Sequence, residues 1–223
     1  SIPSMQRMTN QQIMGMMKMM GPNYYWPVSD QGSVNNGVLI MAHGYGPGGD
    51  QDLFDSAHSV GMIYQTTLSM GMSMMTSSHV ICSVNEMIHN DVEKIFVVPV
   101  SSTAHNTLVR QWNYIFGLEE NYAYAEVEQI NNEKIVMLDP ISDDLYAKKI
   151  ILEYTNEISS DPSNEVLIII AHGPIDEVDN NIELDLMNNI GDYIKQHTSI
   201  KTVMAFTLQD DAPKEIRDRN LDN

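Results

Sequence analysis

The stretch Val38-Leu39-Ile40-Met41-Ala42-His43-Gly44 is an apolar run that ends in histidine and glycine, and it returns as Leu167-Ile168-Ile169-Ile170-Ala171-His172-Gly173. The second histidine follows the first by 129 residues (172 − 43). Short apolar runs rich in β-branched residues are typical of strands that are buried on both faces of a parallel sheet. A glycine after each histidine lets the chain turn sharply, because glycine has no Cβ. The repeat therefore predicts a duplicated unit in which a central strand carries His43 or His172 at its carboxyl end, where open α/β sheets bind their ligands.

Apolar strand patterns alternate with amphipathic helix patterns along the rest of the chain. This alternation predicts an α/β fold of two modules, each a mainly parallel sheet flanked by helices. Besides the two histidine strands, the predicted strands are 66–72, 94–100 and 202–208, and the predicted helices are 51–61, 77–89, 108–116, 143–159 and 180–197. Residues 122–127 and 134–138 are predicted to form either a hairpin with a polar tip or a fourth strand with its return.

The predicted domains are a methionine-rich N-terminal arm (residues 1–36), a first module (37–140) and a second module (141–223). The methionines of the arm are Met5, Met8, Met14, Met16, Met17, Met19 and Met20. Because methionine is an adaptable filler of apolar cores, a packing arm is the favoured interpretation, with a methionine-type copper site as the alternative. The strand at 94–100 has no counterpart after residue 208. We therefore expect the second module to be incomplete in this chain, either because a C-terminal piece is missing or because the module is degenerate. The missing piece is favoured, because a half-module would leave a sheet edge and apolar faces uncovered.

The chain has 12 basic and 30 acidic residues, which gives a formal net charge of −18. This balance argues against nucleic-acid and anionic-membrane partners and suits cationic partners such as metal ions. No apolar run reaches the roughly 18 residues that span a bilayer. We therefore expect a soluble protein, either cytoplasmic or exported after removal of a signal peptide. The lone Cys82 excludes an intrachain disulfide and a cysteine-rich zinc site, and it is predicted to be a buried, inert thiol.

A third histidine, His105, follows the apolar strand at 94–100, which contains Val-Val-Pro-Val, and lies 62 residues after His43 (105 − 43). A His-Gly strand, a helix, a second strand, another helix and an apolar strand with a histidine in its loop together resemble the class II tetrapyrrole chelatases. These are the sirohydrochlorin cobaltochelatases and ferrochelatases. The resemblance covers most of residues 37–210, and the internal repeat is similar to the long, two-module members. The stretch Leu208-Gln209-Asp210-Asp211-Ala212-Pro213 resembles an uncharacterised branch of that family.

The resemblance implies ATP-independent insertion of a divalent metal, Co²⁺ or Fe²⁺, into a bowl-shaped tetrapyrrole such as sirohydrochlorin. In family terms the macrocycle lies between the modules and faces His43 and His105, which are the implied catalytic residues. Neutral imidazole binds these metals and can accept the two pyrrole protons that must leave. The implied metal ligands are His43, His105 and, in the second module, His172. We expect His43 and His105 to approach closely enough to share one ion, and the implied partners are a metal ion and a tetrapyrrole.

One stretch departs from the family, which usually carries an acidic segment on its second strand. Here that stretch is Ser69-Met70-Gly71-Met72-Ser73-Met74-Met75, which lacks a carboxylate. A hard-ion ligand and a proton acceptor are therefore missing. The alternative function is a non-catalytic carrier that binds the metal or the tetrapyrrole, and a third hypothesis is an interaction protein whose methionine-rich arm docks on a partner. An α/β-hydrolase is disfavoured, because no Gly-x-Ser-x-Gly occurs.

The remaining acidic and histidine candidates are weaker. In the second module, Asp210 and Asp211 are predicted either to supply carboxylates to a site or to cap the following helix. The other histidines, all on predicted helices, are interpreted as ordinary surface or core residues. They are His58, His79, His89 and His197.

Overall fold

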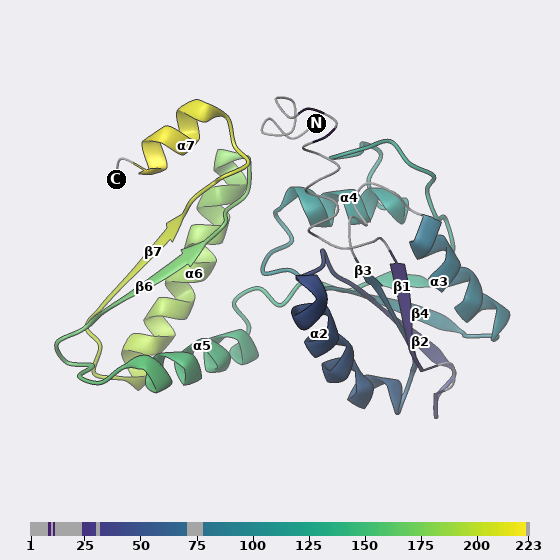
Figure 1. Ribbon diagram of the computed structural model, residues 1–223, viewed down its shortest axis with the longest axis horizontal. Coiled ribbons are helices and arrows are strands. Elements are labelled where there is room, and N and C mark those ends of the chain that lie inside the picture. The colour runs from purple at the N-terminus through teal and green to yellow at the C-terminus, as the bar shows by residue number, and fades with distance from the viewer. Residues whose placement is uncertain (1–8, 10, 12–23, 30–31, 71–77, 222–223) are drawn as a thin grey trace. The chain divides into compact units, whose positions relative to one another are not determined.

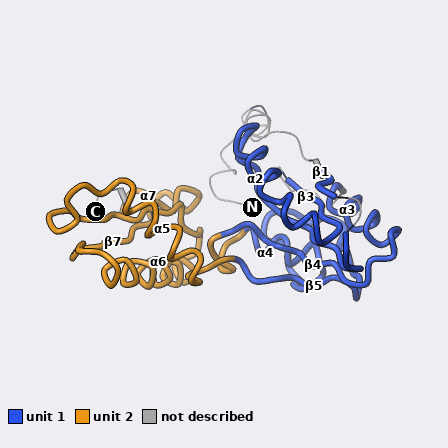
Figure 2. The backbone as a smooth tube through the Cα atoms, turned by 90° about the horizontal axis from the view of Figure 1, so that it is seen from below, with its two compact units in different colours: residues 1, 7–101, 108–140 blue, residues 2–6, 102–107, 141–223 orange. Residues whose placement is uncertain are grey.

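The computed structural model describes residues 9, 11, 24–29, 32–70 and 78–221. The chain divides into two compact units, which have separate colours in Figure 2. Of the described residues, those up to 101 and those from 108 to 140 form unit 1, while residues 102–107 and those from 141 onward form unit 2. Within the described part of the chain, every helix is too short or too polar to pass through a membrane.

Unit 1 is built on a five-stranded sheet in the order β1-β3-β2-β4-β5. Its strands are β1 (Tyr24–Ser29), β2 (Asn36–Met41), β3 (Gln65–Met70), β4 (Lys94–Pro99) and β5 (Ile135–Met137). β2 pairs in parallel with both β3 and β4, β4 pairs in parallel with β5, and β1 runs antiparallel to β3 at one edge. The first histidine strand is therefore a central strand of a mainly parallel sheet, as the sequence predicts (Figure 1).

Helices cover both faces of this sheet, because the residues of β2 alternate between two apolar faces. In the described residues 24–29, 32–70 and 78–140, the helices are α2 (Gly46–Gly61), α3 (Ser78–His89) and α4 (Thr107–Ile115). Val38 and Ile40 pack into a core with residues of α2, whereas Leu39 and Met41 pack into the core that α3 and α4 complete. Each fully buried side chain of this size stabilises the fold by roughly 1.5–3 kcal/mol. The strand end that carries His43 is thus held by cores on both sides.

The described part of unit 2 contains a two-stranded parallel sheet and three helices. They are α5 (Leu145–Ile158), β6 (Val166–Ala171), α6 (Glu177–His197), β7 (Thr202–Thr207) and α7 (Lys214–Leu221). The side chain of Asp176 caps the start of α6, where it accepts hydrogen bonds from the N–H groups of Val178 and Asp179. α6 packs closely on β7, since a Cβ on Gly191 would lie 2.8 Å from Val203 Cγ1. The second histidine strand is therefore also a strand of a parallel sheet covered by a helix.

The other face of the β6–β7 sheet is apolar and exposed. On β6 the exposed fractions of Ile168 and Ile170 are 53% and 62%. Met204 and Phe206 lie opposite them on β7, with exposed fractions of 44% and 39%. Patches of large apolar side chains on a protein surface usually mark a contact region.

Residues 122–127 do not form a strand, so the predicted hairpin is wrong. Residues 135–137 pair in parallel with β4 instead, as a fourth parallel strand of the sheet. The fully buried Gln111 holds the intervening segment: its Oε1 accepts hydrogen bonds from the N–H groups of Ala123 and Tyr124 at 2.9 and 2.8 Å. Its Nε2 donates to the carbonyl of Ala125 at 2.7 Å. These bonds satisfy backbone groups that a strand would otherwise pair in a ladder.

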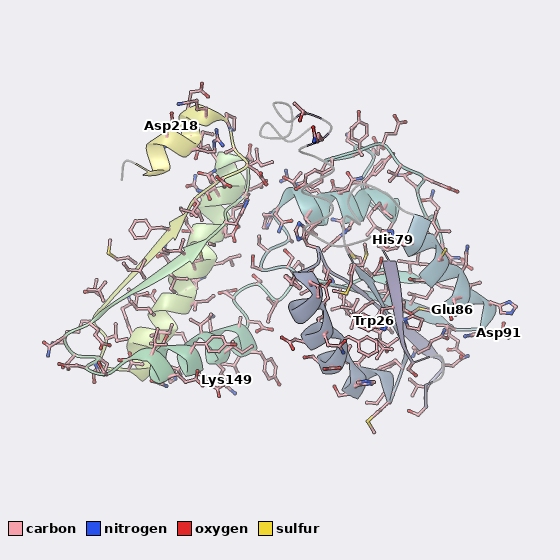
Figure 3. The ribbon with its side chains drawn as sticks, viewed as in Figure 1. Trp26, His79, Glu86, Asp91, Lys149 and Asp218 are labelled. Atoms are coloured by element: carbon pink, nitrogen blue, oxygen red, sulfur yellow. The ribbon has the colours of Figure 1, made fainter. Side chains whose placement is uncertain are left out.

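The edge strand β1 was not predicted from the sequence, and it falls within the segment expected to form an arm. It contains Pro27, which removes a ladder donor and is tolerated only at edges and bulges of a sheet. Trp26 of β1, labelled in Figure 3, stacks on Phe54 of α2 with ring centroids 4.0 Å apart. This stacking and the pairing with β3 are tertiary contacts that help to hold the strand.

Cys82 is exposed, so the prediction of a buried thiol is wrong. It lies on α3, whose inward face is occupied by other positions such as Val80 and Val84. Some methionines on which hypotheses rest lie outside the described residues. They are Met5, Met8, Met14, Met16, Met17, Met19, Met20, Met72, Met74 and Met75.

Candidate metal site at the carboxyl ends of the strands

His43 and His172 occupy equivalent turns, one after β2 and one after β6. Each is followed by a glycine with positive φ, 99° at Gly44 and 78° at Gly173. In both turns the ring Nδ1 lies within hydrogen-bond distance of the next residue's carbonyl oxygen, at 3.1 Å for His43 and 3.0 Å for His172. A carbonyl can only accept, so Nδ1 carries a proton and Nε2 of the neutral ring keeps its lone pair. Each turn therefore presents a nitrogen that can bind a metal ion or accept a proton.

Close packing fixes the turn at His172. A Cβ on Gly173 would lie 2.7 Å from Thr207 Cβ and 3.0 Å from Asn180 Oδ1. Asn180 lies in the first turns of α6 and is 5% exposed. The fully buried Gln209 donates from Nε2 to the carbonyl of Pro174 at 3.0 Å. His172 is thus held in place by three segments: the end of β6, the start of α6 and the loop after β7.

Asp211, in the loop after β7, faces His172. The distance from His172 Nε2 to Asp211 Oδ2 is 3.7 Å, and the two side chains are 61% and 37% exposed. Two donors that bind one ion at about 2.1 Å in tetrahedral geometry lie about 3.4 Å apart. The pair therefore has nearly the spacing of neighbouring metal ligands and is accessible from solvent. Of the two aspartates singled out in the sequence, Asp211 is the one in contact with a histidine.

The loop after His43 is organised by a buried aspartate. Asp50 is 5% exposed, and its Oδ1 accepts a hydrogen bond from the N–H of Tyr45 at 2.6 Å. Burial, and then the negative charge of Asp50, raise the pKa of the Tyr45 phenol. The contact ties the chain just after His43 to the N-terminal part of α2, so the direction in which the chain leaves β2 is fixed.

His105 is exposed and lies in the loop 102–107, which clusters with unit 2 although it connects β4 to α4. Thr103 in this loop is 1% exposed, and its Oγ1 accepts a hydrogen bond from the N–H of His105 at 3.1 Å. The carbonyl of Thr103 accepts from Asn106 Nδ2 at 3.2 Å. The loop therefore has a defined shape of its own. The approach of His105 to His43, one in each unit, stays a prediction.

Sequence reasoning missed Glu183, a carboxyl on α6 that is 6% exposed. Ser102 Oγ donates a hydrogen bond to Glu183 Oε1 at 3.3 Å. Burial raises the pKa of this carboxyl, whereas the hydrogen bond from Ser102 and the charge of His172 act in the opposite direction. A signal was present in the sequence: Glu183 shares a helical face with Asn180 and Met187, and a carboxyl on the inward face of a helix is uncommon.

Among the described residues, no group of three His, Cys, Asp or Glu side chains is arranged to hold a metal ion. His172 and Asp211 are a histidine and a carboxylate that the structure brings close together, 3.7 Å apart. His58, His79, His89 and His197 lie on helices, as predicted. His79, labelled in Figure 3, is 7% exposed, and neither of its ring nitrogens has a hydrogen-bond partner among the described residues.

The fold is a chelatase-like α/β fold with a mainly parallel sheet flanked by helices, as one solved structure shows. That structure is SirB from Bacillus subtilis with Fe³⁺, to which the chain is similar with a TM-score of 0.56 and 15% sequence identity. The match covers 78% of this chain and 66% of SirB, so the chain spans slightly less than two thirds of SirB. No protein-family model and no curated protein matches the chain. At this identity the similarity concerns the fold alone.

Proposed function

We propose that the protein is a chelatase-like enzyme that binds a divalent metal ion, Co²⁺ or Fe²⁺, and a tetrapyrrole, and inserts the metal into the macrocycle. The observation that carries the proposal is the repeated His-Gly turn, in which a carbonyl engages Nδ1 and leaves Nε2 available. The similarity in fold to SirB, whose structure was solved with Fe³⁺, supports it. The net charge of −18 favours a cationic substrate.

Metal insertion requires that two pyrrole N–H protons leave and that the cation exchanges its water for ring nitrogens. A neutral imidazole can bind a borderline metal and can accept a proton at neutral pH. We assign the proton-accepting role to His43 and His105, and metal binding to these two residues and His172. Asp211 adds a carboxylate beside His172, which strengthens the hold on a divalent cation in unit 2.

The test is an anaerobic insertion assay with sirohydrochlorin and Co²⁺, followed by the change in the absorption spectrum of the macrocycle. We expect several turnovers per protein molecule, and a loss of at least tenfold in rate for His43→Ala and for His105→Ala, because each removes an assigned base. His197→Ala is the matched control, since its Nδ1 also meets a carbonyl, that of Tyr193 at 2.7 Å, but on a helix away from the strand ends. Equal rates in all three variants would contradict the assignment.

A non-catalytic carrier is the second candidate. The observation that favours it is the methionine-rich stretch 69–75, which lacks the carboxylate found in the enzymes that the sequence resembles. A carrier binds Co²⁺ or the tetrapyrrole at a fixed stoichiometry and releases no metallated product. The same assay separates the two candidates, because product that never exceeds one equivalent per protein molecule supports the carrier and sustained turnover supports the enzyme.

A further inference from the structure

We propose that Glu183 is a positioning residue that anchors the loop 102–107, and with it His105, to the end of unit 2 that carries His172. The role of the two histidines rests on the proposed function. The anchor itself rests on contacts within unit 2 and can be tested without any metal.

The first observation is the place of Glu183 on α6. It follows Asn180 by three residues and precedes Met187 by four, so the three side chains share one face of the helix. That face is buried, and Asn180 Oδ1 reaches the Cα of Gly173 so closely that a Cβ there would lie 3.0 Å away. Glu183 therefore lies one helical turn from the His172–Gly173 turn. A glutamate is almost never buried to this extent unless a partner holds it.

The second observation is the partner. Ser102 Oγ donates to Glu183 Oε1 at 3.3 Å, across 81 positions of sequence. Ser102 is followed by Thr103, which is buried and accepts the N–H of His105 on its Oγ1. The backbone between Ser102 and His105 is thus short and internally bonded. Fixing Ser102 on α6 therefore restricts the position of His105.

The third observation is electrostatic. Burial raises the pKa of Glu183, and two influences oppose it, the hydrogen bond from Ser102 and the charge of His172. One comes from the segment that carries His105 and the other from the turn that follows β6. Both histidine-bearing segments thus act on Glu183, which is the placement that an anchor between them requires.

The test uses the full chain without metal and measures amide hydrogen exchange of residues 102–107 by mass spectrometry. The variants are Glu183→Ala, which removes the acceptor, Glu183→Gln, which keeps an acceptor oxygen for Ser102, and Ser102→Ala, which removes the donor. Asp185→Ala is the control, because Asp185 is an exposed acid two residues further along the same helix. The affinity for Co²⁺ alone is then measured by calorimetry for the same proteins.

We expect faster exchange in 102–107 for Glu183→Ala and Ser102→Ala, and wild-type exchange for Glu183→Gln and Asp185→Ala. Substitution of residues that orient metal ligands typically weakens metal binding 10–100-fold. Glu183→Ala and Ser102→Ala should therefore bind Co²⁺ about tenfold more weakly than the wild type. Unchanged exchange in Ser102→Ala, or equal loosening in Asp185→Ala or in Glu183→Gln, would overturn the anchor. If the wild type binds no Co²⁺, the proposed function fails, while the exchange result still decides the anchor.

Discussion

A backbone carbonyl determines which ring nitrogen is available at His43 and at His172. In both turns Nδ1 is 3.0–3.1 Å from the carbonyl oxygen of the following glycine, so the lone pair of a neutral ring lies on Nε2. The positive φ of Gly44 and Gly173 brings that carbonyl back toward the ring. The same local geometry thus arises twice from the same short sequence, which makes it a property of the His-Gly turn rather than of one unit.

Asp211 gives the turn at His172 a second donor. We predict that Asp211→Asn weakens Co²⁺ binding at least about tenfold, because the carboxylate 3.7 Å from His172 Nε2 is replaced by a weak neutral ligand. Asp210→Asn is the control, since it removes the same charge from an exposed neighbour. Calorimetry at neutral pH measures both variants. An equal loss of Co²⁺ affinity in the two variants would mean that the negative charge attracts the ion without direct ligation by Asp211.

His79 makes stability depend on pH. Burial lowers its pKa to about 4, whereas the unfolded chain takes up the proton near the usual 6.5. Between these values the unfolded state binds more protons, so stability is present above pH 6.5 and is lost as the pH falls toward 4. The loss is up to about 3 kcal/mol. We predict that His79→Leu removes this part of the pH dependence of urea unfolding, whereas His89→Leu, at the exposed end of α3, leaves it.

Sequence patterns located the strand-end histidines, because the residues around them are local signals: an apolar run, a histidine and a glycine. Glu183 and Gln111 were not found, because their roles depend on partners that only folding brings close. The partner of Glu183 is 81 positions away in sequence, and the farthest partner of Gln111 is 14 positions away. Asp211 was one of two candidates, and only the course of the loop after β7 distinguishes it from Asp210.

At the scale of elements, the turn after β6 is fixed by packing that a side chain at Gly173 would break. We predict that Gly173→Ala lowers the free energy of unfolding by about 2–4 kcal/mol, because alanine is strained in the left-handed backbone conformation and would be overpacked against Thr207. Gly46→Ala is the control, because Gly46 also has positive φ, 77°, but has open space at its Cβ position. It should cost only about 1–2 kcal/mol. Urea unfolding measures both, and equal costs would show that crowding at Gly173 is unimportant.

Periodicity predicted the parallel strands and their helices, and the predicted boundaries agree with the structure to within a few residues, except that α2 begins at Gly46, five residues before the predicted start at 51. The exceptions have physical reasons. Residues 122–127 have a strand-like composition, but Gln111 satisfies their backbone groups. β1 contains Pro27, and its strand conformation depends on pairing with β3 and on the stack of Trp26 on Phe54. The local sequence pattern therefore predicts central strands well. It predicts poorly those segments whose structure depends on pairing at a sheet edge or on a single buried side chain.

At the scale of the whole molecule, the two faces of the β6–β7 sheet differ in burial. Ile168 points to the exposed face and Ile169 to the face packed on α6, so the same substitution tests both. We predict that Ile169→Ala lowers the free energy of unfolding by about 2–4 kcal/mol, whereas Ile168→Ala lowers it by about 1 kcal/mol or less. The measurement is urea unfolding of each variant. Equal costs would mean that the outer face is covered in solution.

The decisive measurement is X-ray absorption at the cobalt edge on protein loaded with Co²⁺, because it reports whether Nε2 of the strand-end histidines binds a divalent metal. We expect imidazole nitrogen ligands at about 2.1 Å in the wild type, and their loss in a variant that combines His43→Ala, His105→Ala and His172→Ala. A cobalt site with oxygen donors alone, or a spectrum that the three substitutions leave unchanged, would mean that these histidines do not bind the metal.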